Sequence, residues 1–216
     1  MSSADAENIS RIREIVTTHY RRYGRSFPWR DTRDPYAITV SEFMLQQTGT
    51  ERVLKKYPPF LAAFPTFAAL AGASLRDVLG LWSGLGYNRR ARALTETCRR
   101  VRDEYGGVLP GDPETLLSFP GIGPGTAGSI PAFAYNRPTV FIETNIRRVF
   151  LHFFFPGREA VRDGEILPLV EAALDRDNPR EWYYALMDYG VYLKGLHPNP
   201  NRSEEHTSEL QSRITI

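Results

Sequence analysis

Cysteine, lysine and long apolar runs are scarce in this sequence. Cys98 is the single cysteine, which excludes an internal disulfide and a metal cluster held by several cysteines. We therefore expect a protein of the reducing cytoplasm. No apolar run approaches the roughly 20 residues of a membrane span, and the polar first residues do not resemble a signal peptide. We expect no association with a membrane.

Positive charge is carried almost entirely by arginine. Only three of the 27 basic residues are lysines (Lys55, Lys56 and Lys194), and the formal net charge is +2. Arginine suits bidentate contacts with phosphate, so this bias is consistent with a polyanionic partner. A compositional bias of the source genome explains it equally well.

The end of the chain differs in character from the rest. The segment RSEEHTSELQS, from Arg202 to Ser212, matches the in-frame translation of a widely used sequencing adapter. We therefore expect residues 202–216 to be a non-native artefact and base the fold prediction on residues 7–201.

Helical periodicity runs through most of the chain. Residues 7–24 place Ile9, Ile12 and Val16 on one face, and Gly24 is expected to end that helix. Further segments with helical spacing are joined by short loops, which predicts an all-α fold. These segments are residues 36–47, several helices within 50–105, 113–117, 126–135, 144–155 and two more within 161–196, with an extended stretch at 136–142.

A turn rich in glycine, residues 119–128, separates two of the predicted helices. We expect its glycines to adopt positive φ and to leave backbone N–H groups unobstructed beside a helix start. Such a turn binds an anion such as a phosphate, although an ordinary helix–helix turn has the same residues. Pro131, inside the second helix, is expected to kink it or to cost about 3 kcal/mol.

The environments of two glutamates are expected to favour opposite protonation states. Glu42 shares an apolar helical stripe with Ile38 and Leu45, and burial there is expected to raise its pKa toward values useful for proton donation. Glu143 begins a helix, where free amides and the helix dipole favour the anion. The alternatives are a solvated surface glutamate at 42 and a simple capping residue at 143. Glycosidic chemistry uses such an acid and anion pair.

Aromatic and basic residues occur together in two further segments. The loop RSFPWRDTRDPY, residues 25–36, suits either a rigid recognition loop or a cap on the core through Trp29. Tyr87 lies at a turn flanked by glycine and is followed by Arg89, Arg90 and Arg92, a combination found in proteins that stack on bases. A merely packed tyrosine is the alternative there.

Six segments together carry a family resemblance that covers residues 9–195. They are PWR (28–30), SEFMLQQT (41–48), LWSGLGYNRRARAL (81–94), FPGIGPGTAG (119–128), ETNIRRV (143–149) and LMDYG (186–190). By these segments the chain resembles the helix-hairpin-helix (HhH-GPD) DNA glycosylases and, within them, the adenine DNA glycosylases of the MutY type. The resemblance implies two helical lobes, a barrel of helices with the hairpin at about 28–135 and a second lobe from 7–27 and 136–201, with the active-site cleft between them.

The resemblance also implies roles for individual residues. Glu42 corresponds to the acid that protonates the departing adenine at N7, and Glu143 stands where the family has an aspartate that supports the sugar cation. The remaining implied roles are wedging into the duplex beside a flipped base (Gln47 and Tyr87), contact with the base or its pocket (Arg25, Arg30 and Asp188) and contact with DNA phosphate (Gly121, Ile122, Gly123, Gly125 and Thr126).

Three departures from the family pattern bear on chemistry. Glu143 is one methylene longer than the usual aspartate. Gly125 occupies the position of the Schiff-base lysine of endonuclease III relatives, so β-lyase chemistry is not expected. The first two cysteines of the family's iron–sulfur cluster fall at Lys194 and Asn201, so we expect no cluster, no metal and no other cofactor.

We therefore expect a monomeric, monofunctional base-excision-repair glycosylase of the bacterial cytoplasm, associated with the nucleoid. Its expected partner is double-stranded DNA containing a mispair, from which it flips an adenine and hydrolyses the N-glycosidic bond. The alternatives are a glycosylase for another base, such as uracil or thymine opposite guanine or a damaged purine, and a non-catalytic helix-hairpin-helix DNA-binding module.

Overall fold

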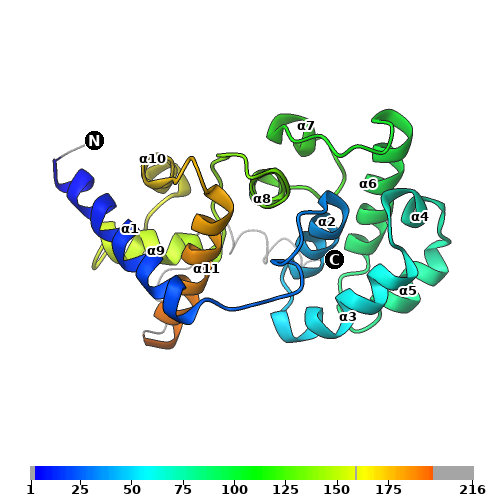
Figure 1. The fold of residues 1–216 in the computed structure, drawn as a ribbon, viewed down its shortest axis with the longest axis horizontal. Coiled ribbons are helices and arrows are strands. Elements are labelled where there is room, and N and C mark those ends of the chain that lie inside the picture. The colour runs from blue at the N-terminus through cyan, green and yellow to red at the C-terminus, as the bar shows by residue number, and fades with distance from the viewer. Residues whose placement is uncertain (1–2, 159, 197–216) are drawn as a thin grey trace. The chain divides into compact units, whose positions relative to one another are not determined.

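The computed structural model describes residues 3–158 and 160–196, and the regular elements of this part of the chain are all helices (Figure 1). The all-α prediction is therefore confirmed. Asn201 and the suspected artefact lie outside the described residues. The helices are α1 (Ser3–Tyr23), α2 (Pro35–Leu45), α3 (Thr50–Ala63), α4 (Phe67–Gly72), α5 (Leu75–Trp82), α6 (Arg89–Glu104), α7 (Pro113–Leu117), α8 (Pro124–Tyr135), α9 (Thr144–Phe154), α10 (Asp163–Ala173) and α11 (Pro179–Leu196).

The chain divides into two compact units. The central unit, Ser26–Thr139, contains α2 to α8, and the terminal unit combines the described residues up to Arg25 with those from Val140 onward. The boundaries expected from the resemblance, 28–135 for the first lobe, differ from these by a few residues. Every helix in the described part of the chain is too short or too polar to cross a bilayer.

The central unit is built around α2. Asp34 caps this helix by accepting from the backbone N–H groups of Tyr36 and Ala37, and Pro35 follows at the first helical position. Apolar residues occupy nearly every face of α2, so the helix is buried among α3, α6 and α8. Trp29 is 5% exposed and stacks on Phe27, so the loop before α2 caps the core through Trp29.

The helical hairpin consists of α7, the turn between Ser118 and Gly123, and α8. The second helix begins at Pro124, two residues before the predicted start, because proline is favoured at the first helical position. It runs unbroken through Pro131 and ends at Asn136, whose backbone adopts a left-handed conformation. The carbonyl of Pro131 accepts from the N–H groups of Asn136 and Arg137, which satisfies this helix end.

The terminal unit packs α9 against α11, with α1 along α10 and α11 (Figure 1). Ile12 and Val16 are fully buried, as the periodicity of α1 predicts, and the N–H of Gly24 donates to the carbonyl of Tyr20 where α1 ends. Gly190 permits the closest approach of α11 to α9, because a Cβ there would lie 2.4 Å from the carbonyl oxygen of Asn145. The start of α9, where Glu143 lies, is therefore held against α11.

Candidate active site

Glu42 lies in α2 of the central unit and is half-buried. The hydroxyl of Ser129, in α8, donates a hydrogen bond to Oε2 of Glu42. Ser129 is 3% exposed, so this contact lies inside the unit. Glu42 is therefore not the fully solvated helix residue that the alternative interpretation of the sequence describes.

Glu143 caps the N-terminus of α9 in the terminal unit. One carboxylate oxygen accepts from the backbone N–H groups of Asn145 (2.8 Å) and Ile146 (2.9 Å), and the other accepts from the side-chain amide of Asn145 (3.2 Å). The guanidinium of Arg148 donates in turn to Asn145 Oδ1 and to the carbonyl of Gly190, which fixes the cap against α11. Capping and anion stabilisation are thus two consequences of one geometry.

The direction in which the pKa of Glu143 is shifted differs from the expectation. Burial raises the pKa of Glu143 above its usual range, and the hydrogen bonds from Asn145 and Ile146, together with the charge of Arg148, oppose that rise without cancelling it. The sequence interpretation considered only the amides and the helix dipole and so predicted the opposite direction. Desolvation of the charged form is the reason for the difference.

The three glycines of the hairpin turn have different roles. Gly121 has a φ of +76°, and a Cβ there would lie 2.7 Å from the Cβ of Ala93, so both backbone and space require glycine. Gly123 is the extended N-cap of α8, with a φ of −95°, and nothing lies within 4 Å of where its Cβ would be. Gly125 is within the first turn of α8. The prediction of positive φ is therefore right for Gly121 and wrong for Gly123 and Gly125.

The remaining hairpin residues hold the turn in place. The side chain of Ile122 is 6% exposed in the core of the central unit, and its N–H donates to the carbonyl of Phe119, so Ile122 anchors the turn. The side-chain amide of Gln46, at the end of α2, donates to the carbonyl of Gly121 and to the hydroxyl of Thr126. Gly123, the N-cap of α8, has no side chain that could cap the helix. The N-terminus of α8 therefore presents backbone amides, as helix termini that bind anions do.

The two predicted wedge residues share an unusual backbone. Gln47 (φ 54°) and Tyr87 (φ 48°) are two of the three non-glycine residues with positive φ among those the structure describes. Both residues are exposed, Tyr87 at 51%. A strained conformation at an exposed polar or aromatic side chain is typical of functional sites.

Arg90 joins the two segments that carry Gln47 and Tyr87. It is 6% exposed, and its guanidinium also lies 5.5 Å from the ring centroid of Tyr87. The sequence interpretation grouped Arg90 with Arg89 and Arg92 as positive charge beside a potential stacking ring, but the guanidinium of Arg90 is directed into the protein. Its guanidinium donates to the carbonyls of Phe43, Met44, Gln46, Leu85 and Gly86 and to the hydroxyl of Thr48.

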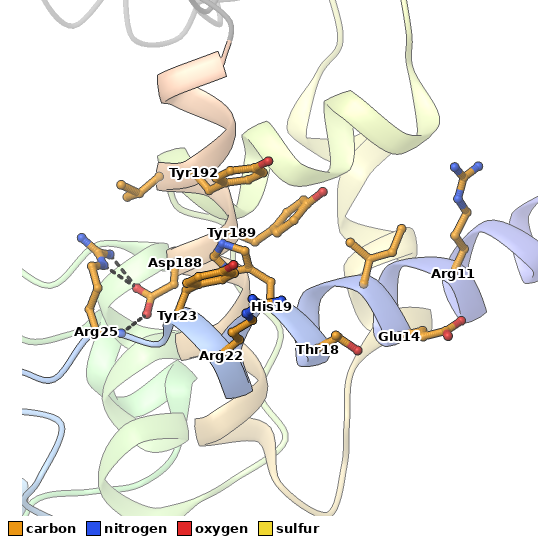
Figure 2. A pocket seen from close by; sticks show the side chains of 12 residues that line it. Arg11, Glu14, Thr18, His19, Arg22, Tyr23, Arg25, Asp188, Tyr189 and Tyr192 are labelled. Atoms are coloured by element: carbon orange, nitrogen blue, oxygen red, sulfur yellow. Dashed lines mark hydrogen bonds and ion pairs between the residues drawn. The ribbon is translucent and has the colours of Figure 1, made fainter.

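Two of the three predicted base-pocket residues meet in the terminal unit. Figure 2 shows the guanidinium of Arg25 facing the carboxylate of Asp188. Nε and the backbone nitrogen of Arg25 each donate to a carboxylate oxygen of Asp188 at 2.8 Å. The pair borders a cavity of about 890 Å³ lined also by His19, Tyr189 and Tyr192. Burial lowers the pKa of His19, and the charge of Asp188 opposes this.

Arg30, the third predicted pocket residue, belongs to the central unit. Its guanidinium lies over the ring of Phe27, 5.1 Å from the centroid.

The roles of three residues were not predicted from the sequence. Ser129 binds the proposed acid, Gln46 binds the hairpin, and Arg90 braces the segments that carry Gln47 and Tyr87. One signal was available for Ser129, because it is a lone hydroxyl in the small, apolar sequence AGSIPAFA of α8. Such a group needs a hydrogen-bond partner when it is buried.

Comparison with known protein families matches the part of the chain that carries these residues. The model of the HhH-GPD superfamily base excision DNA repair proteins matches residues 40–164, a range that includes Glu42, the hairpin and Glu143. The chain belongs to this family.

Individual relatives agree with that membership. An adenine DNA glycosylase of Mycobacterium tuberculosis is 44% identical over 179 residues, which are 80% of this chain and 58% of the relative. The chain spans about half the length of the curated relatives it matches. Among solved structures, a thermostable thymine-DNA glycosylase matches with a TM-score of 0.81 and 26% identity, over 87% of this chain and 88% of that one. An endonuclease III–DNA complex has the same fold, with a TM-score of 0.72 and 19% identity over 85% and 86%.

Proposed function

We propose that this HhH-GPD protein is a DNA glycosylase that flips a mispaired adenine from duplex DNA and hydrolyses its N-glycosidic bond. The observation that carries this proposal is Glu42, a half-buried carboxylate hydrogen-bonded to Ser129 within the region that matches the family. The name of the mycobacterial relative supports adenine as the base.

In the proposed reaction Glu42 is the general acid. It gives its proton to N7 of the adenine as the C1′–N9 bond breaks, and the bonding electron pair leaves with the base. Glu143, as the anion, stabilises the positive charge that develops on the sugar. Water then bonds to C1′, and its proton passes to Glu143. The chain offers no lysine at Gly125 for a covalent route, so the reaction is monofunctional.

The proposed partner is double-stranded DNA containing a mispair, bound by a monomer. The amides at the start of α8 suit a DNA phosphate, and Gln47 and Tyr87 are exposed at two braced turns where side chains can enter the duplex. Arg25 and Asp188 supply a donor and an acceptor for a flipped base, and Arg30 supplies a second guanidinium.

We propose that the activity needs no iron–sulfur cluster. Cys98, the single cysteine, is fully buried in the core of the central unit, and burial raises its pKa, which disfavours the thiolate that binds metal. Lys194, at the position of a family cluster cysteine, is exposed on α11 and has no ligating thiol. The residues present therefore do not fit a cysteine-held cluster.

A second candidate is removal of thymine or uracil opposite guanine. The structural likeness to a thymine-DNA glycosylase favours it, because that protein shares most of its length with this chain. The acid, the hairpin and the wedge residues would be the same, and the contacts made to the base would differ.

Single-turnover base release tests both candidates. Duplexes carrying A opposite 8-oxoguanine, A opposite G, T opposite G and U opposite G would be compared, with Glu42→Gln as the control. Release of adenine that disappears in the control supports the proposal, and release of T or U moves the assignment to the second candidate. Binding without release from any duplex contradicts both and favours a non-catalytic DNA-binding module.

A further inference from the structure

Ser129 has two possible acceptors for one proton. Its hydroxyl donates to Glu42 Oε2, and its oxygen also lies 3.3 Å from the carbonyl oxygen of Thr126, one turn earlier in α8. A hydroxyl has one donor and two acceptor lone pairs, and its hydrogen rotates to suit the partner. Both alternatives are therefore available to Ser129 without movement of the backbone.

A general acid must be accommodated in two protonation states. While Glu42 carries its proton, that proton can be donated to Ser129 Oγ, and the hydroxyl hydrogen then points to the carbonyl of Thr126. After Glu42 has released its proton, the hydroxyl turns and donates to the carboxylate oxygen that it already contacts. Every proton is accounted for, since one moves from Glu42 to the base and the hydroxyl proton of Ser129 changes only its acceptor.

We propose that Ser129 is a positioning residue that holds Glu42 in both protonation states and stabilises the carboxylate as it forms. This inference rests on the proposed function. Its physical basis is that a hydrogen bond to a charged group is stronger than one to a neutral group, so Ser129 favours proton release. Because Ser129 is 3% exposed, solvent does not readily replace its hydroxyl.

The same contact connects the acid to the hairpin. Thr126 supplies the second acceptor from the first turn of α8, and its hydroxyl accepts from Gln46 at the end of α2. The segment that would contact a DNA phosphate is thus the segment that orients the partner of Glu42.

The test is the variant Ser129→Ala with Ser41→Ala as the matched control. Ser41 is also buried, at 2% exposure, and lies next to Glu42, but its hydroxyl donates to the carbonyl of Ile38. Single-turnover base release would be measured across pH on the duplex that the unmodified protein cleaves. Ser129→Ala is expected to lower the plateau rate about tenfold, and the alkaline decline of the pH–rate profile should move to higher pH.

A merely structural role predicts a different result. If Ser129 only supports the fold, its replacement lowers base release by the same factor at every pH and leaves the pH–rate profile in place. The control Ser41→Ala should also leave the pH–rate profile in place. Ser129→Cys, which keeps a similar volume but has a much weaker donor, should show the same displacement as Ser129→Ala. Unchanged pH–rate profiles in both Ser129 variants would overturn this inference. The proposed function would be unaffected by that result, provided that the unmodified protein releases the base. No release by the unmodified protein would instead overturn the proposed function.

Discussion

The two candidate catalytic glutamates are held in different ways, each within its own unit. Glu42 lies in a buried helix and is bound by the side-chain hydroxyl of Ser129, whereas Glu143 caps a helix and is bound mainly by backbone amides. A hydroxyl can reverse its hydrogen bond when its partner gains or loses a proton, but a backbone amide can only donate. The hydroxyl of Ser129 can therefore bind Glu42 in either protonation state, whereas the amides at Glu143 bind the carboxylate form and oppose a burial that raises its pKa.

The largest effect is expected from a substitution of Glu42. Glu42→Gln keeps the shape and an acceptor for Ser129 but removes the proton donor, so base release should fall about 100- to 10,000-fold. Single-turnover assays measure the rate, and a thermal melt checks the fold. A variant that retains the unmodified rate would remove Glu42 from the chemistry.

The next effect concerns the charge of Glu143. Glu143→Gln should slow base release on the order of 100-fold, because stabilisation of the sugar cation is lost. Glu143→Asp, which restores the residue usual in the family, should retain most of the rate. Comparable rates for the two variants would contradict the role of the charge.

The raised pKa of Glu143 has a separate consequence for stability. With a folded pKa above the unfolded value, this group's stabilising contribution is complete below the unfolded pKa, near 4.3, and is lost as the pH rises through the folded value. Glu143→Gln does not titrate and so does not lose this contribution. The melting temperature of the variant minus that of the unmodified protein should therefore increase from pH 4 to pH 8. A constant difference across this range would show that burial does not govern Glu143.

A fourth prediction concerns Arg90, which braces the turns that carry the predicted wedge residues. Arg90→Met leaves several buried carbonyls without a donor and should lower the free energy of unfolding by about 3 kcal/mol or more. Arg89→Met and Arg92→Met, at exposed neighbours, should stay within about 0.5 kcal/mol of the unmodified protein. Urea unfolding distinguishes them, and equal effects at all three positions would reject the brace.

The smallest effects separate two glycines of the hairpin. Gly121→Ala combines a left-handed backbone with a clash against Ala93 and should cost about 1–3 kcal/mol of stability. Gly123→Ala has open space and a permitted φ, so its stability should change little while duplex binding weakens. Melting curves and a titration with duplex DNA measure the two quantities. Unchanged DNA affinity in Gly123→Ala would contradict close approach of a phosphate there.

Local patterns explain why much of the fold was predictable. The apolar spacing of α1, the stop at Gly24 and the glycine turn before α8 each depend on residues close together in the chain. The start of α8 was predicted two residues late, although the proline rule that corrects it is also local. Glu42 and Glu143 were found as candidates because helix periodicity and a helix start are visible in sequence.

Contacts between distant residues explain what was missed. Ser129 and Glu42 are 87 positions apart, and Arg90 reaches the end of α2 from more than 40 positions away. The sequence interpretation treated Arg89, Arg90 and Arg92 alike, because sequence alone does not show which member of an arginine cluster faces inward.

The sequence by itself determined the helices, the hairpin and the two candidate carboxylates, because helix propensity, glycine geometry and capping act over a few residues. Only the tertiary structure decided that Ser129 contacts Glu42, that Arg90 is buried and that burial outweighs the amides in the pKa of Glu143. The physical reason is that hydrogen-bond partners and desolvation depend on what the fold places beside a group.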